Sequence, residues 1–157
     1  MNRFPGNPIL KPIPDHSWES KLVFNAAAVL LDDNVHILYR AMGNDGVSRL
    51  GYAKSSDGFH IDERLEDPVF EPLNETEQFG CEDPRITLID DKLVMAYTAL
   101  TKRDHWQLYQ ISLTSIEIEE FINNNWSWKK RFLPFGGIRN KNAVVFPRKI
   151  GNNCFIG

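Results

Sequence analysis

The densest group of chemically useful side chains in the sequence is the motif GCEDPR, which runs from Gly80 to Arg85. It places the carboxyl groups of Glu82 and Asp83 beside the guanidinium of Arg85. A carboxyl group that gives up its proton can act as a general acid, and a fixed cation can hold polar or anionic groups of a ligand. An Asp-Pro pair is also ordinary turn chemistry, with Arg85 as a surface ion-pair partner. The position of the motif in the fold decides between the two interpretations.

The motif lies within an internal repeat. The segment NAAAVLLDDNVHILYRA, which begins at Asn25, aligns without a gap with DPRITLIDDKLVMAYTA, which begins at Asp83. The offset is 58 residues, and a third copy is expected to begin near Lys141 after the same interval. Repeats of about 40–50 residues made of several short strands are typical of propeller blades, and a somewhat longer unit fits the same plan. The alternative is that two β-hairpins share turn residues by chance.

The elements that must position these residues are predicted to be strands. Short segments rich in β-branched and aromatic residues alternate with turn sequences, which is the pattern of strands joined by hairpins. Only 115–123 is expected to form a turn or two of helix. We therefore predict an all-β chain, a partial β-propeller over 1–157 with an extended lead-in at 1–22 and blade repeats that start near 25, 83 and 141. The expected strands are Ala27–Leu31, Val35–Tyr39, Arg49–Lys54, Ile86–Ile89, Leu93–Thr98, Leu108–Leu113 and Ala143–Phe146.

A propeller would bring the starts of the three repeats together. The inner strands of propeller blades line a central channel, where ligands bind. Asn25, Asp83 and Lys141 would then direct an amide, a carboxyl and an ammonium group towards one axis. A sugar site needs that mixture, because hydroxyls require donors and acceptors and a glycosidic oxygen requires an acid as it leaves. The alternatives are a turn-capping role for Asn25 and an ordinary solvated lysine at 141.

The composition excludes several other classes of function. The formal net charge is −3 and no basic run is present, so we expect no nucleic-acid partner. No segment approaches the ~20 apolar residues of a membrane span, so we expect no membrane partner. Cys81 and Cys154 are the only cysteines and lack the spacing of a metal site, so no metal is expected. These features indicate a soluble protein of the reducing cytoplasm.

The repeat strings resemble a known family. NAAAVLLDDNVHILYRA, DGVSRLGYAKSSDGFHI, GCEDPRITLIDDKLVMAYTA and NKNAVVFPRKI are similar to the opening blades of glycoside hydrolase family 130, five-bladed propellers that act on β-mannosides. The resemblance covers roughly Val23 to the end, or about two and a half blades. It implies an enzyme that performs inverting phosphorolysis of a β-mannoside oligosaccharide and releases mannose 1-phosphate. Inorganic phosphate would be a co-substrate, and no other cofactor is implied.

The resemblance also implies roles for individual residues. Asp83 matches the catalytic acid, which is thought to act through a hydroxyl of the mannose. The residues that match Asn25 and Arg40 hold the mannose, and Lys141 matches a phosphate-binding residue. Arg40 is expected to assist Lys141 with phosphate, because a phosphate site requires fixed cations. We also expect three further residues to bind substrate, namely Arg49, Glu82 and Arg85.

The sequence departs from the family pattern at one point and leaves two other functions open. Members that use phosphate generally add an arginine from the second blade, but no Lys or Arg lies between Arg103 and Lys129. A β-mannoside hydrolase on the same scaffold is one alternative, with Glu82 or a carboxylate outside this chain as its base. A non-catalytic, carbohydrate-binding half-propeller is the other. Two and a half blades do not close a ring, so we expect the isolated chain to self-associate.

Overall fold

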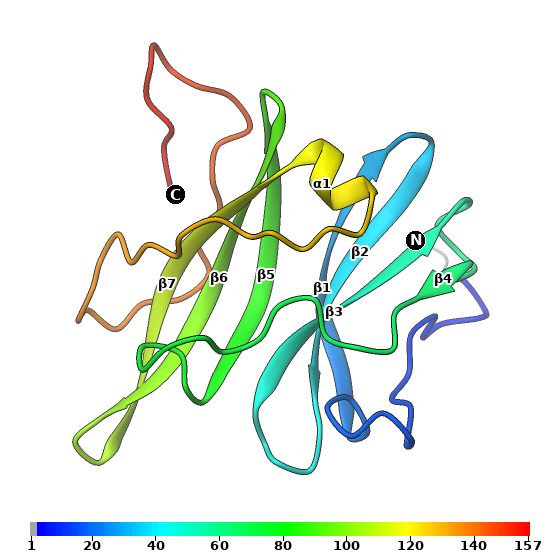
Figure 1. The fold of residues 1–157 in the computed structure, drawn as a ribbon, viewed down its shortest axis with the longest axis horizontal. Coiled ribbons are helices and arrows are strands. Elements are labelled where there is room, and N and C mark those ends of the chain that lie inside the picture. Colours follow the sequence, from blue (N-terminus) through cyan, green and yellow to red (C-terminus); the bar gives the residue numbers. More distant parts are fainter. Residues whose placement is uncertain (1–2) are drawn as a thin grey trace.

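The structure, a computed structural model, describes residues 3–157, and its regular secondary structure is almost wholly strand (Figure 1). This confirms the all-β prediction. The one short helix is α1 (Ile118–Ile122). The strands are β1 (Leu22–Leu31), β2 (Asn34–Met42), β3 (Ser48–Ser55), β4 (Glu63–Arg64), β5 (Gly80–Ile89), β6 (Lys92–Arg103) and β7 (Trp106–Glu117).

The strands form two antiparallel units that fan apart from each other (Figure 1). The first unit contains β1, β2 and β3, with the short β4 paired to β3. The second unit contains β5, β6 and β7. The only ladder pair that joins the two units is a parallel one between Ser48 and Gly80. The sheet is therefore open within the described residues, and it does not by itself give a number of blades.

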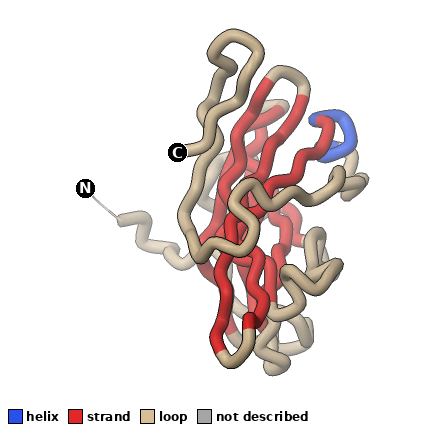
Figure 2. Tube along the Cα trace, turned by 90° about the vertical axis from the view of Figure 1, so that its left-hand side faces the viewer, coloured by secondary structure: helices blue, strands red, loops and turns tan. Residues whose placement is uncertain are grey.

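Six of the seven expected strands lie inside observed strands, and α1 lies inside the expected helical segment. The prediction for Ala143–Phe146 was wrong. Outside the named strands, Val145 forms only an isolated bridge with Ile156, and Figure 2 draws this C-terminal segment as loop. Backbone hydrogen bonds join Val144 to Gly157 and Phe146 to Phe155 around this bridge. The pairing is therefore β-type, but it is too short to form a ladder.

Each unit has only a partial fourth strand. In the first unit Phe70 forms an isolated antiparallel bridge with Leu50 of β3, beyond the two residues of β4. In the second unit Phe132 forms the corresponding bridge with Leu113 of β7. The outermost segment of each unit thus runs beside the third strand but forms only a few of the backbone hydrogen bonds of a full strand.

Three clusters of buried apolar side chains cover the faces of the two units. The largest core lies between the two units and combines Leu38 and Tyr52 of the first with Met95 and Tyr97 of the second. The opposite face of the first unit packs against the lead-in. The opposite face of the second unit packs against the C-terminal segment. Each sheet is thus covered on both faces, and burial of these apolar side chains stabilises the relative position of the units.

A glycine allows the two units to approach closely beside the polar cluster described below. Gly80 has a φ of 150°, and a Cβ atom there would lie 3.0 Å from the Cβ of Ser48. Any larger residue would push β5 away from β3 at the one ladder pair that joins the units. Gly80 therefore fixes the distance between the strands that carry the site.

The first unit contains a buried ionic group. Glu19 is fully buried, and its Oε2 accepts a hydrogen bond of 2.9 Å from the Tyr39 hydroxyl. The same carboxylate pairs with the Arg64 guanidinium, and its Oε1 contacts His16. A buried carboxylate needs such partners, because its desolvation would otherwise cost several kcal/mol.

The second unit contains a corresponding group. Glu77 is also fully buried, and its Oε2 accepts a hydrogen bond of 2.7 Å from the Tyr97 hydroxyl. Arg131 pairs with its Oε1, and Asn74 donates to the same oxygen over 3.3 Å. Cys81 donates weakly to Oε2, and burial, followed by the charge of Glu77, raises the pKa of its thiol. The thiol is therefore protonated and unreactive.

Candidate functional site

Two strand irregularities position Asn25 and Asp83. The pairing of β1 shifts register between Phe24 and Ala27, and the pairing of β5 shifts between Glu82 and Arg85. Within each shift one residue has a left-handed backbone, Asn25 with φ 47° and Asp83 with φ 52°. Asn and Asp tolerate this conformation better than other residues with a Cβ. A bulge redirects a side chain out of the strand alternation, so both side chains face the same space.

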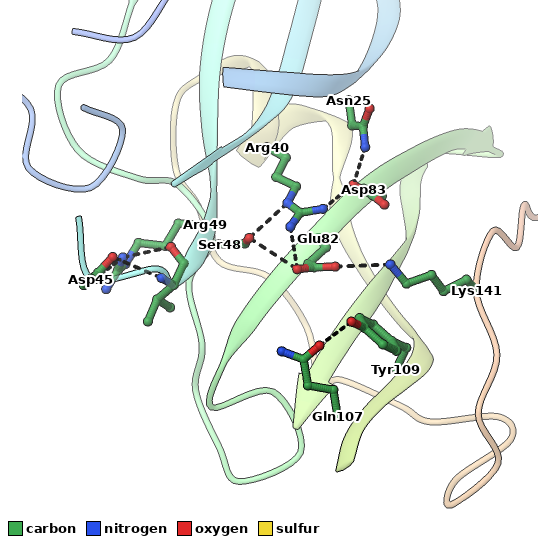
Figure 3. A network of polar contacts seen from close by, with 11 residues as sticks. Asn25, Arg40, Asp45, Ser48, Arg49, Glu82, Asp83, Gln107, Tyr109 and Lys141 are labelled. Carbon is green, nitrogen blue, oxygen red and sulfur yellow. Dashed lines mark hydrogen bonds and ion pairs between the residues drawn. The ribbon is translucent and has the colours of Figure 1, made fainter. Parts of the chain in front are cut away.

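The two bulge residues contact each other directly. Asn25 Nδ2 donates a hydrogen bond of 2.7 Å to Asp83 Oδ1 (Figure 3). Arg40 of β2 donates from Nη1 to the same oxygen over 3.1 Å. Its Nη2 donates over 2.6 Å to Glu82 Oε1. One guanidinium therefore holds the two neighbouring carboxylates of β5 and joins the two units.

Two residues that sequence analysis did not select complete the support of Arg40. Ser48 Oγ accepts a hydrogen bond of 2.9 Å from Arg40 Nε and lies 3.4 Å from Glu82 Oε1. The Phe24 ring lies under the guanidinium, with 4.5 Å from Arg40 Cζ to the ring centroid. Phe24 lies 58 residues before Glu82, so the repeat alignment could have identified Phe24 as a residue of the site. Nothing in the sequence around Ser48 indicated its role.

Lys141 also reaches this cluster, but its repeat position differs from the expected one. Its Nζ lies 3.5 Å from Glu82 Oε2 and 4.2 Å from the centroid of the Tyr109 ring. The left-handed residue of the third repeat is Asn142, with φ 65°. Asn142, rather than Lys141, is therefore the counterpart of Asp83, and Lys141 corresponds to Glu82. The one-residue difference explains why Lys141 pairs with Glu82 instead of contacting Asp83.

The surroundings of Asp83 favour its ionised form. Burial by itself would raise the pKa of the Asp83 carboxyl group, whose side chain is 13% exposed. The hydrogen bonds from Asn25 and Arg40, with the positive charges of Arg40 and Lys141, outweigh burial and hold this pKa below its ordinary value. The site as it stands therefore contains a negatively charged Asp83 at neutral pH.

The structure does not bring Arg49 and Arg85 into this cluster. Arg49 pairs with Asp45 over 2.8 Å and lies 3.6 Å from Glu71, beyond Ser48 (Figure 3). It lines a separate cavity of about 790 Å³ together with Trp18. Arg85 donates to the carbonyl oxygen of its neighbour Pro84. The roles expected for these two arginines remain predictions.

No arrangement suited to a metal ion occurs in residues 3–157, where no three His, Cys, Asp or Glu side chains are grouped for one. In the same part of the chain, no helix is long and apolar enough to cross a membrane.

An all-β chain with a carboxylate, an amide and cations gathered at strand bulges has the features of a carbohydrate-active enzyme. A sequence model described as beta-1,4-mannooligosaccharide phosphorylase matches residues 1–156. The chain belongs to glycoside hydrolase family 130.

Characterised relatives come from Thermoanaerobacter sp. (strain X514). One is a "Beta-1,2-mannobiose phosphorylase", 39% identical over an alignment of 126 residues that covers 72% of this chain and 41% of that protein. Another is a "1,2-beta-oligomannan phosphorylase", 34% identical over an alignment of 157 residues that covers 96% of this chain and 50% of that protein. The chain therefore spans about half the length of these relatives.

Solved structures give the same picture of the fold. A structure whose description reports family 130 hydrolases that target beta-1,2 mannosidic linkages in Candida mannan matches with a TM-score of 0.77 and 30% identity. The match covers 90% of this chain and 45% of that one. A putative glycoside hydrolase from Parabacteroides distasonis matches with a TM-score of 0.76 and 27% identity, over 100% of this chain and 50% of that one.

Proposed function

We propose that this chain supplies the acid and much of the sugar site of an inverting β-mannoside phosphorylase, which transfers mannose to inorganic phosphate. The observation that carries the proposal is the Asp83 carboxylate at a strand bulge, held by Asn25 and Arg40. The two phosphorylase relatives support phosphate as the co-substrate. Because the chain spans about half their length, we further propose that it forms the first blades of a five-bladed propeller.

Asp83 is the acid in this proposal. The bond between the anomeric carbon and the glycosidic oxygen breaks, and an oxygen of phosphate bonds to that carbon from the opposite face. The proton of Asp83 passes through a mannose hydroxyl to the departing oxygen. Phosphate is itself an anionic nucleophile, so a single protein carboxyl group suffices. The products are α-mannose 1-phosphate and the shortened sugar.

Phosphate binding would also prepare Asp83 for this role. A general acid must hold a proton, but Asn25, Arg40 and Lys141 lower the pKa of Asp83. A phosphate anion beside Lys141 would offset that positive charge and raise the pKa of Asp83. The enzyme would then acquire its acid when its nucleophile is bound, which disfavours reaction with water.

The mannose would be held by Asn25, which contacts Asp83, and by Arg85, which does not. The Asn25 amide donates one hydrogen bond to Asp83 and keeps its carbonyl oxygen for a sugar hydroxyl. Arg85 donates only to a backbone carbonyl, so it retains donors for the substrate. Arg49, in its separate cavity beside Trp18, would bind a more distant residue of the oligosaccharide.

Hydrolysis is the second candidate, because the description of one structural relative reports glycoside hydrolases within family 130. A hydrolase requires a base with a free oxygen close to the attacking water. Glu82 is 3% exposed, and Arg40 and Lys141 contact its two oxygens. It therefore neutralises cations in the site, and this arrangement favours phosphorolysis.

The protein carrying this chain tests the proposal when it is given β-1,2-mannobiose with and without inorganic phosphate. We expect mannose 1-phosphate to form only with phosphate, and chromatography separates it from free mannose. Asp83→Asn should slow formation of the product by roughly 10²–10⁴. Asp33→Asn, at another left-handed turn position, should leave the rate unchanged. Equal release of free mannose without phosphate would contradict phosphorolysis and establish the hydrolase.

We propose in addition that the isolated 157-residue chain self-associates. Its sheet is open, and apolar side chains of its C-terminal segment are exposed, including those of Phe146, Ile150 and Phe155. Open edges and apolar patches both promote association. Sedimentation of the purified chain checks this, and a monodisperse monomer that unfolds cooperatively would contradict it.

We also propose the cytoplasm as the location of the enzyme, and the two free thiols, Cys81 and Cys154, support this.

A further inference from the structure

A polar cavity opens beside Lys141, and neither Asp83 nor Glu82 is among its lining residues. Its volume is about 510 Å³, and it is lined by Tyr109, Arg139, Asn140 and Lys141. Both cationic side chains contact the Tyr109 ring, with 4.2 Å from Lys141 Nζ and 5.4 Å from Arg139 Cζ to the ring centroid. Cations are attracted to an aromatic face, so the ring gathers two positive charges at one cavity.

The charge of this cavity is not balanced by the protein. Among residues 3–157, the one carboxylate within 4.0 Å of Lys141 is that of Glu82, at 3.5 Å, and Glu82 already pairs with Arg40 over 2.6 Å. Arg139 has no carboxylate partner within 4.0 Å among residues 3–157. Two like charges placed at one cavity repel each other unless an anion lies there. The cavity therefore favours an anionic ligand.

The segment that carries the two cations is held against β7 by hydrogen bonds. The Asn140 backbone N–H donates to the Tyr109 carbonyl oxygen over 3.0 Å, and its side-chain oxygen accepts from the Ile111 N–H over 2.6 Å. Further along, the Gly137 N–H donates to the Gln110 side chain over 2.7 Å. Preorganised donors lose little freedom on binding, so such a site binds more tightly than a loose loop.

We infer that Arg139 is the second cation of the phosphate site, and that the Tyr109 ring positions it beside Lys141. The inference rests on the proposed phosphorolysis, and it adds a guanidinium from the segment after the second unit to the ammonium group of Lys141. A guanidinium offers two parallel N–H groups to a phosphate, which an ammonium group cannot. The ligand is the phosphate group itself, whether of inorganic phosphate or of mannose 1-phosphate.

Calorimetric titration of the protein with inorganic phosphate, and separately with mannose 1-phosphate, tests this at constant ionic strength. Arg139→Gln should weaken both ligands by about tenfold or more, because a charge-assisted hydrogen bond is lost. The phosphate affinity of Arg139→Lys should lie between those of the wild type and Arg139→Gln, since lysine keeps the charge and loses the two parallel N–H groups. Arg148→Gln is the matched control, because it removes the same charge from an exposed position outside the cavity.

Two results would overturn the inference. One is a phosphate affinity that falls in Lys141→Gln but not in Arg139→Gln, because Lys141 would then bind phosphate without Arg139. The other is a loss for mannose 1-phosphate alone, since Arg139 would then contact the sugar. Circular dichroism of each variant shows whether it is folded. A protein that binds phosphate as expected and yet releases no mannose 1-phosphate would support Arg139 and contradict only the proposed reaction.

Discussion

The two units of the sheet have the same buried framework. In the first, the Glu19 carboxylate accepts the Tyr39 hydroxyl, and in the second the Glu77 carboxylate accepts the Tyr97 hydroxyl. Both residues of the pair recur at an offset of 58, and an arginine pairs with each carboxylate. The repeated sequence therefore preserves an interior charge network in both units.

The same two units differ at the bulge where chemistry is proposed. The first presents the Asn25 amide and the second the Asp83 carboxyl group, on nearly the same backbone conformation. An amide and a carboxyl group have almost the same shape, but only the carboxyl group can donate a proton as an acid. The repeat therefore gives both residues the same backbone geometry, but only the carboxyl group of Asp83 can act as an acid.

The largest expected effect comes from making the second unit like the first. Asp83→Asn leaves two amides at the bulges and removes the acid, so turnover of a β-mannoside should fall by roughly 10²–10⁴. The fold should persist, because Asn also tolerates the left-handed backbone. Initial rates and circular dichroism check this. A variant that retains more than about a tenth of the activity would exclude Asp83 as the acid.

The buried framework should matter nearly as much, but to stability. Glu77→Gln leaves the Arg131 charge without its partner, and removal of one member of a buried pair costs about 3–5 kcal/mol in the free energy of unfolding. Urea denaturation measures it, with exposed Glu75→Gln as the control. Glu19→Gln should cost a similar amount in the first unit. Unequal losses would show that the two frameworks are alike in geometry only.

The reverse change makes the first unit like the second. Asn25→Asp would place a second carboxylate where the Asn25 amide now lies, 2.7 Å from Asp83. Two carboxylates so close cannot both ionise easily, so the upper pKa of the pair rises. The alkaline limb of the pH–rate profile should move up by about one unit or more. An unmoved limb, like that expected for exposed Asn125→Asp, would contradict the contact.

The smallest expected effect is on the pH dependence of stability. The pKa of Asp83 is lowered in the folded protein, so the group stabilises the fold above its unfolded pKa, and this is lost as pH falls through the folded pKa. The difference in unfolding free energy between wild type and Asp83→Asn should therefore shrink as pH falls below about 4. Denaturation at several acidic pH values measures it. A constant difference would show that Asp83 is not held as a carboxylate.

Much of the fold was predictable because it depends on local pattern. Alternating apolar residues and Asp-Asp turns gave six strands, and the 58-residue offset gave the pairing of Asn25 with Asp83. The third repeat was misplaced by one residue, because a bulge adds a residue without changing the pattern around it. The left-handed Asn142, which marks the register, is visible only in the backbone.

The rest of the site depends on contacts between distant segments, which no local pattern records. Ser48 supports Arg40 only because Gly80 lets the two units approach at that point. Tyr109 gathers Lys141 and Arg139 because the segment after α1 returns to β7. The buried Glu19 and Glu77 share the repeat offset, so an alignment extended upstream would have found them.

The most direct test of Asp83 as the acid varies the leaving group. The rates of wild type and Asp83→Asn are compared on β-1,2-mannobiose and on an aryl β-mannoside whose phenolate leaves without a proton. The account predicts a large loss on mannobiose and a loss at least tenfold smaller on the aryl mannoside, since a good leaving group needs no acid. Equal losses on both substrates would contradict it, because Asp83 would then serve binding or structure instead of proton transfer.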